Sequence, residues 1–510
     1  MIPLEWMPPL MFGGLIIFML IGFPVAFSLM AAGLFFSIIA ISEGFFGLPF
    51  LQAIPQRIFG GVLANDLLLA IPFFTFMGAL LERCGLAEEM LDSMGQLFGR
   101  VRGGLGYSVI IVGFILGAIT GTVAAQVIAM TMISLPVMMR YGYNMRYATG
   151  VLAASGTITQ LVPPSLVLIV LADQLKTQSG SADVGSMYLG AWGPSLLQIA
   201  LFALYTFILS RIHPDYLPPV PDSDLTLKGW ELWKKCLMGI IPSAVLIFLV
   251  LGTIMTGIAT PTESGAMGAM GALLLAWLRR ASIPNLKGLI QEAYQNTMRI
   301  TAMVVFILIG STCFSVVFQG VDGGQWVENL FSDLPGGWIG FLIVVNLFVF
   351  FLAFFLDFFE IAFIIVPMLA PVAVKVLSPV LLDSMNGNPQ AAASAALVWF
   401  GVMLCVNMQT SFMHPPFGFA LFYLRGVAPK EVKSSDIYWG ALPWVGLQLI
   451  MVAVVIAFPA LITTLLDKPA AIAQSQDFNF TNSEDSKADA PANKVDEDAP
   501  VNFQLDKPNK

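Results

Sequence analysis

Several short polar groups in this chain carry oxygen atoms that could bind a cation. Two of these groups place hydroxyl side chains around a glycine, at 120–122 (Thr-Gly-Thr) and at 155–157 (Ser-Gly-Thr). Both groups lie inside long uncharged runs of the sequence. Where a helix is interrupted inside a membrane, such hydroxyls and the freed backbone carbonyls can surround Na⁺. The alternative is that the hydroxyls only pack and hydrogen-bond between membrane helices.

A few charged side chains stand inside or beside apolar segments, where an ionisable group is usually functional. Asp357 and Glu360 are separated by one helical turn and are flanked by phenylalanines. Two roles stay open for them and for Glu263: a carboxylate of a binding site, or an acid at the end of a membrane helix. Arg425 could neutralise a substrate carboxylate or anchor its helix at the membrane interface.

Sequence signatures of ATP hydrolysis and of common hydrolases are absent from the chain. There is no GxxxxGK[ST] loop, no HExxH and no GxSxG. The four cysteines are scattered, and the two histidines are too few for a zinc or haem site made of protein ligands alone. We therefore expect no cofactor and no enzymatic activity, with an intramembrane lipid-modifying enzyme as a remote alternative.

The composition predicts an all-α polytopic membrane protein in contact with the lipid bilayer. Of the 510 residues, 57% are hydrophobic and 11% are charged, against about 25% charged residues in soluble domains. Several uncharged runs exceed the ~20 apolar residues that a spanning helix needs. A net charge of −8 without a basic cluster argues against nucleic-acid binding. Residues 467–510 are polar and acidic, and we expect them to form a disordered tail.

Glycines and prolines recur in the same order in the two halves of the apolar body. The pairs are Pro24 with Pro261, Gly78 with Gly310, Gly103 with Gly336, Pro136 with Pro371, and Pro163 with Pro415. We predict a first membrane repeat at 1–214, a polar connector at 215–235 and a second repeat at 236–466. Duplicated halves with interrupted helices are typical of secondary transporters, whose repeats are often inverted.

Each half contains one segment that fits a re-entrant hairpin and one that fits a broken helix. We predict hairpins at about 103–139 and about 350–374, and broken helices at about 147–172 and about 396–424. The first of these segments could alternatively form one long helix. A broken helix exposes backbone groups that lipid cannot satisfy, so it persists only where it lines protein or water. The amphipathic segments 82–102 and 285–299 suit interfacial helices that link moving and static parts, or ordinary connecting helices.

A series of motifs, in one order along residues 5–465, gives the chain a family resemblance. They read GFPVAFS from Gly22, AIPFFTFMGALLERCGLAEEM from Ala70, GRVRGGL from Gly99, GAITGTVAA from Gly117, ASGTITQLVPPS from Ala154, GIATPTESGAMGA from Gly257, FFLDFFEIAFIIVPMLAP from Phe354 and HPPFGFALFYLRGVAP from His414. With these motifs the chain resembles the large membrane subunit of tripartite ATP-independent periplasmic (TRAP) transporters, the DctM-like proteins. Its final part looks most like the mannitol and chloroaromatic branch.

The resemblance implies a sodium-coupled carrier that imports a small organic acid across the bacterial inner membrane. A transport domain would move like an elevator against a scaffold. Two further proteins are implied, a periplasmic substrate-binding protein and a small membrane subunit. We expect the small subunit to be a separate chain, because this one begins at the large-subunit motif. A stand-alone, ion-coupled anion carrier without a soluble receptor is the alternative.

The resemblance also implies two Na⁺ sites and a solute-coupling region, with no other metal. The first cation site would comprise Thr120, Gly121, Thr122, Ser155, Gly156 and Thr157. The second would comprise Asp357, Asn407, Gln409 and Thr410. The solute and coupling residues would be Pro163, Pro164, Glu263, Glu360, His414, Pro415, Pro416 and Arg425. Two positions depart from the family pattern: Thr-Gly-Thr replaces Ser-Gly-Ser at the first tip, and His414 replaces a threonine.

Overall fold

The computed structural model describes residues 3–226, 229–281, 283, 285–332, 334–354, 356–415 and 418–467, and every named element in these ranges is helical. Eight helices of this described part are long and apolar enough to cross a membrane. The bent pair Leu48–Leu63 and Asp66–Glu82 adds a ninth when it is counted as one span. The predicted all-α polytopic fold is confirmed, while the inverted order of the repeats stays a prediction. The predicted tail beyond Asp467 lies outside the described residues.

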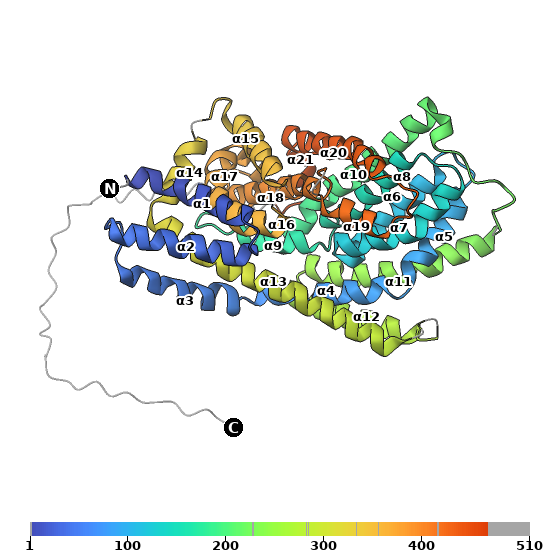
Figure 1. Ribbon diagram of the computed structural model, residues 1–510, viewed down its shortest axis with the longest axis horizontal. Coiled ribbons are helices and arrows are strands. Elements are labelled where there is room, and N and C mark those ends of the chain that lie inside the picture. Colours follow the sequence, from blue (N-terminus) through green and yellow to red (C-terminus); the bar gives the residue numbers. More distant parts are fainter. Residues whose placement is uncertain are drawn as a thin grey trace, which may run out of the picture. The chain divides into compact units, whose positions relative to one another are not determined.

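The helices follow the chain from α1 to α21 (Figure 1). The first part of the chain forms α1 (Met7–Leu20), α2 (Val25–Ser42), α3 (Ala53–Arg57), α4 (Ala70–Glu82), α5 (Leu86–Phe98), α6 (Gly104–Thr120) and α7 (Val123–Arg140). The middle part forms α8 (Met145–Thr157), α9 (Leu166–Gln174), α10 (Val184–Ile212), α11 (Trp230–Met255), α12 (Pro261–Leu278), α13 (Leu286–Gly320) and α14 (Gly323–Ser332). The last part forms α15 (Gly337–Leu352), α16 (Phe358–Glu360), α17 (Val366–Leu381), α18 (Pro389–Met408), α19 (Phe419–Val427), α20 (Ser434–Ala457) and α21 (Ala460–Thr463).

Two interruptions of helical structure coincide with paired prolines. The first separates α8 from α9 and contains Pro163 and Pro164. The second separates α18 from α19 and contains Pro415, while Pro416 lies outside the described residues. Before each interruption the helix tightens into a 3-10 turn, Ile158–Gln160 in the first case and Gln409–Phe412 in the second. Proline has no backbone N–H to donate and clashes with the preceding turn, so a helix does not continue smoothly through such a pair.

Two pairs of helices joined by short tips accompany these broken helices. In the first pair, α6 and α7 meet at Gly121, whose φ of 61° is readily adopted by glycine. The second pair joins α15 to a stretch made of α16, the π turn Ile361–Ile365 and α17. Its predicted bounds, 350–374, are too narrow, because the helices extend from Gly337 to Leu381. Lys375 ends the uncharged run but not the helix, and its ammonium group pairs with Glu328 of α14 at 2.5 Å.

Two other segments differ from the sequence-based expectation. The predicted connector at 215–235 is too long at its end, because α11 already begins at Trp230 and Lys235 in its first turns pairs with Asp92 of α5. The segment 285–299 is not a separate interfacial helix, because it forms the start of α13. No proline interrupts α13, so the helix continues into the apolar sequence that follows.

Helices from before the connector pack against helices from after it. α2 lies along α13, α4 along α12 and α5 along α11, and Figure 1 shows α2 and α13 side by side. Glycines allow a close approach: a Cβ atom placed on Gly310 would lie 2.4 Å from the carbonyl oxygen of Ala26. Small residues have this role between membrane helices because packing, rather than water exclusion, holds them together.

The broken helices both pack on α20. The contact between α8 and α20 is especially close, because a Cβ atom on Gly150 would lie 2.3 Å from the carbonyl oxygen of Gly440. In the reverse direction, a Cβ atom on Gly440 would lie 2.2 Å from the carbonyl oxygen of Arg146. Backbone atoms cannot rotate away as side chains do, so α20 fixes the position of the first broken helix.

The substitution Gly150→Ala is expected to separate α8 from α20 and to lower stability by about 1–3 kcal/mol, the usual range for overpacking. The control is Gly446→Ala on α20, where a Cβ atom would meet nothing within 4 Å. Unfolding of the purified protein by SDS measures both variants. Equal stability of the two variants would contradict the close contact.

Candidate functional site

Gln126 of α7 joins the first helix pair to the first broken helix. Its Nε2 atom donates to the carbonyl of Gly113 at 2.6 Å and to that of Ser155 at 2.9 Å. Thr159 Oγ1 lies within hydrogen-bonding distance of Gln126 Oε1 and 2.8 Å from the carbonyl oxygen of Gly156, and its single proton can go to either. All these side chains are buried. The predicted first-site residues at 155–157 are therefore held against α6 and α7 by an amide that the sequence-based prediction did not include.

The tip between α6 and α7 approaches the same break. Gly117 lies one turn before the tip, and a Cβ atom there would lie 3.2 Å from Cα of Thr159. Thr122 is the residue before α7, and the side chain of Thr120 lies outside the described part of the structure. Ser155 Oγ is buried and has no hydrogen-bond partner among the described residues. The structure thus brings the predicted tip and the predicted broken helix together, while cation binding there stays a prediction.

The second broken helix is joined to α15 by two asparagines. Asn407 donates from Nδ2 to the carbonyl of Asn346 at 2.8 Å and to Asn346 Oδ1 at 3.0 Å. Asn346 in turn donates to the carbonyl of Leu342 at 2.8 Å. The hydroxyl of Thr410 donates to the carbonyl of Asn407 at 2.7 Å. Among the described residues, Asn407 Oδ1 is buried without a partner, so this predicted ligand keeps one free acceptor.

Asp357 and Glu360 form a capping box at the tip of the second helix pair. Asp357 Oδ1 accepts from the backbone N–H of Glu360 at 3.0 Å, and Glu360 Oε2 accepts from that of Asp357 at 3.1 Å. Each carboxylate thereby satisfies an N–H group that a helix start leaves unpaired. Both acids are half-buried. The helix-terminal role considered for them is observed, and it leaves further carboxylate oxygens at the tip.

His414 packs the second break against α15 and the segment after it. Its ring is 2% exposed and stacks on Phe354, with ring centroids 4.2 Å apart, and it meets the edge of Phe350 at 4.4 Å. Two aromatic rings on one imidazole give it a packing role at the tip. Pro164 lines a small pocket together with Ala118 and Ile119 near the first tip.

Two of the predicted site residues have partners away from the interruptions. Glu263 forms an exposed capping box with Thr260 at the start of α12, a helix that packs mainly on α4 and α11. Arg425 is exposed and donates from Nη1 to the carbonyl of Val432 at 2.6 Å, which fixes the loop after α19. Each of the two side chains thus has a local backbone partner, while their roles in binding stay predictions.

Gln448 of α20 connects the two interruptions and was absent from the sequence-based prediction. Its Nε2 atom donates to Thr157 Oγ1 at 3.0 Å and lies 3.5 Å from Gln409 Oε1. Thr157 belongs to the first predicted cation site and Gln409 to the second. A single amide in an otherwise apolar spanning helix was the one local signal that could have drawn attention to it.

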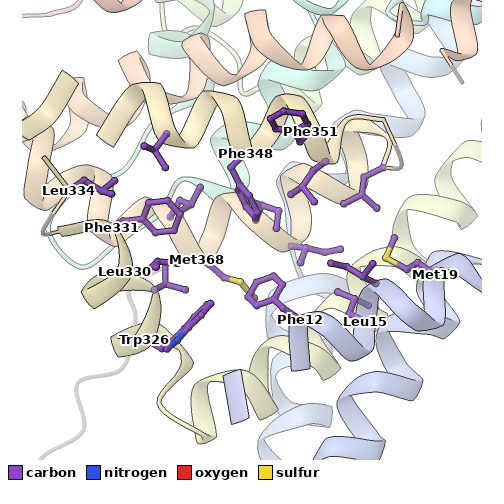
Figure 2. Close-up of a pocket in the computed structure, with 18 of the residues that line it drawn as sticks. Phe12, Leu15, Met19, Trp326, Leu330, Phe331, Leu334, Phe348, Phe351 and Met368 are labelled. Carbon is purple, nitrogen blue, oxygen red and sulfur yellow. The ribbon is translucent and has the colours of Figure 1, made fainter. Parts of the chain in front are cut away.

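A cavity of about 640 Å³ lies between α1, α14, α15 and α17 (Figure 2). Apolar side chains line it, among them Phe12, Leu15, Leu330, Phe348 and Met368. Among the described side chains that line it, the indole of Trp326 carries the only nitrogen or oxygen atom. An anionic solute needs hydrogen-bond donors or positive charge, so this cavity does not suit one. The polar residues around the interruptions are the better candidates.

Known proteins are similar to this chain in sequence and in fold. Residues 12–461 match the family described as tripartite ATP-independent periplasmic transporter, DctM component. The C4-dicarboxylate TRAP transporter large permease protein DctM of Vibrio cholerae serotype O1 is 27% identical, over 89% of this chain and 97% of that protein. The sialic acid TRAP transporter large permease protein SiaM of the same species is 27% identical, over 86% and 93%.

Among solved structures, the YdaH transporter of Alcanivorax borkumensis is similar in fold. The TM-score is 0.54 with 16% identity, over 82% of this chain and 90% of that one. At this identity the likeness concerns the fold alone. It agrees with the polytopic helical architecture that the sequence predicts.

Replacing Gln126 by methionine keeps the side-chain volume but leaves the buried carbonyls of Gly113 and Ser155 without this donor. We expect a loss of about 1–3 kcal/mol in the free energy of unfolding. The control is Gln198→Met in α10, because the Gln198 amide is buried and has no partner among the described residues. SDS unfolding should show the control to be neutral or stabilised, and an equal loss in both variants would contradict the bridging role of Gln126.

Proposed function

The chain belongs to the DctM component family of tripartite ATP-independent periplasmic transporters, and we propose that it couples the import of a small organic acid to Na⁺. It is a large permease subunit, a multi-pass protein of the bacterial inner membrane, and a transporter rather than an enzyme. The observation that carries the proposal is the meeting of two interrupted helices at Gln448, each braced by its own pair of helices.

Interrupted helices supply the chemistry that sodium coupling requires. The last carbonyls of α8 and α18 and the neighbouring hydroxyls and amides are neutral oxygen ligands of the kind that suit Na⁺. The starts of α9 and α19 carry partial positive charge, which favours a carboxylate. The residues proposed for Na⁺ remain those of the two predicted sites, with Ser155 and Asn407 each keeping a buried oxygen atom unpaired among the described residues.

The solute class is proposed from the relatives together with this chemistry. One relative is named for C4-dicarboxylates and another for sialic acid, and both solutes carry carboxylates. A small organic acid is therefore the class proposed for this chain. Membership of the mannitol and chloroaromatic branch stays a prediction.

An elevator motion is proposed from the contrast between two kinds of contact. Buried polar hydrogen bonds join the broken helices to α7, α15 and α20. The apolar cavity in Figure 2 lies between α1 on one side and α15 and α17 on the other. Apolar surfaces slide past each other with little loss of specific bonds. The broken helices, together with α7, α15 and α20, could therefore move as one body. In this proposal α2, α4, α12 and α13 belong to the scaffold.

The family works as one component of a tripartite system. We propose that this chain acts with a small membrane subunit and a periplasmic substrate-binding protein, each a separate chain. The binding protein would deliver the solute, and selectivity for the solute would then reside largely outside the membrane. This arrangement distinguishes the proposal from a stand-alone carrier, which would need no soluble receptor.

Proteoliposomes that contain the chain and its two partners provide the test of sodium coupling. With an inward Na⁺ gradient we expect accumulation from a panel of radiolabelled small carboxylates that includes a C4-dicarboxylate. Replacing Na⁺ by choline, without a proton gradient, should abolish accumulation, and unchanged uptake would contradict sodium coupling. Uptake that persists without the binding protein would favour the stand-alone carrier.

The substitution Asp357→Asn tests the second cation site. Asparagine caps a helix about as well as aspartate, so the protein should fold. Loss of the charge should nevertheless reduce Na⁺-driven uptake at least about tenfold, because one cation contact typically corresponds to a few kcal/mol. Glu263→Gln alters the matching capping box on α12 and should leave uptake near the wild-type level. Near-normal uptake by the Asp357→Asn variant would remove Asp357 from the site.

A further inference from the structure

Gln448 lies where the two interrupted helices meet. Its side chain is fully buried, and its Nε2 atom is 3.0 Å from Thr157 Oγ1 and 3.5 Å from Gln409 Oε1. A primary amide carries two N–H donors, so one glutamine can donate to both helices at once. Neither a hydroxyl nor an apolar side chain of this length could do so.

Hydrogen bonds fix α20 to both broken helices on either side of Gln448. Toward the start of α20, Arg146 of α8 pairs with Asp436 at 3.2 Å, and Thr149 Oγ1 lies 3.3 Å from the carbonyl oxygen of Asp436. Toward its end, Trp399 of α18 donates from Nε1 to the carbonyl of Val455 at 3.0 Å. Because α20 is held at both ends, a displacement of Gln448 with one broken helix changes its hydrogen bond to the other broken helix.

The two amides that meet here leave complementary atoms unpaired. Gln448 Oε1 is a buried acceptor and Gln409 Nε2 is a buried donor, and neither has a partner among the described residues. Leaving such atoms unpaired costs free energy. A shift of either broken helix that pairs these two atoms would therefore be favourable.

We propose that Gln448 is a positioning residue that couples the two predicted Na⁺ sites, so that filling one site sets the geometry of the other. The inference rests on the sodium coupling proposed above. In this proposal Gln448 does not bind the cation itself. It acts through the hydroxyl of Thr157 and the carboxamide of Gln409. Two sites linked in this way bind their ligands cooperatively, and the effect of each on the other is reciprocal.

The test uses the full-length chain in lipid nanodiscs and Na⁺ alone as the probe. NaCl is titrated at constant ionic strength with choline chloride, and the unfolding temperature is followed, because a ligand that binds the folded state raises it. The wild type should give a sigmoidal curve with a Hill coefficient above one. Gln448→Met keeps the length of the side chain but removes both donors. Its Hill coefficient should fall to about one, and the half-saturating Na⁺ concentration should rise roughly three- to tenfold.

Two further variants separate positioning from a general role in packing. Gln448→Asn keeps the amide but is one methylene shorter, so it cannot reach both partners and should also lose cooperativity. Gln198→Met removes a fully buried amide of α10 that has no partner among the described residues. It should keep the wild-type Hill coefficient, whatever its effect on the unfolding temperature without Na⁺.

The outcomes distinguish this inference from the proposed function. A wild-type protein that Na⁺ does not stabilise contradicts the proposed sodium coupling, and this inference with it. A cooperative wild type whose Gln448→Met and Gln448→Asn variants keep the same Hill coefficient contradicts the inference alone. Loss of cooperativity in both variants, with the Gln198→Met control unchanged, supports it.

Discussion

A helix that ends inside a membrane leaves backbone groups that lipid cannot bond, and protein must satisfy them. The first interruption shows how this is done. The carbonyl of Gln160 accepts from Ser165 Oγ and, at 3.2 Å, from Cys405 Sγ of the second broken helix. Ser165 Oγ also accepts from the backbone N–H of Val167 at 3.1 Å and so caps α9. Each interruption therefore requires neighbours, and the helix pairs, α18 and α20 are the elements that supply them.

The two halves meet this requirement with different bonds. In the first half the helix pair donates, from Gln126 to the carbonyl of Ser155 on the broken helix. In the second half the broken helix donates, from Asn407 to Asn346 on α15. The halves thus share the positions of their interruptions but not the side chains that brace them. The predicted repeat would accordingly keep its glycines and prolines while little other identity remains between its two copies.

The sequence predicts features that depend on local chemistry, and it misses those that depend on distant contacts. The interruptions were predictable because the missing N–H of proline acts within one turn. The end of the second helix pair was not predictable. Lys375 looked like the end of the apolar segment, because the sequence does not show that Glu328 pairs with it. The roles of Asn346 and Gln448 come from residues far away in the chain. For Glu263 the sequence left two roles open; TPTE is a capping-box signature, and the structure shows that helix-terminal role. The ion and solute roles of the candidate residues stay predictions.

The unbroken length of α13 has a mechanical consequence. Thirty-five residues at ~1.5 Å each make a rod of roughly 50 Å, whereas the hydrocarbon layer is ~30 Å thick. The rod must tilt or project, and its first turns carry an exposed acid, Glu292, that pairs with Arg83. Farther along, Ser311 donates to the carbonyl of Phe363 in the π turn, at 2.6 Å. That bond joins the long helix of the proposed scaffold directly to the turn beside the second tip, so a displacement of the tip along α13 must break it.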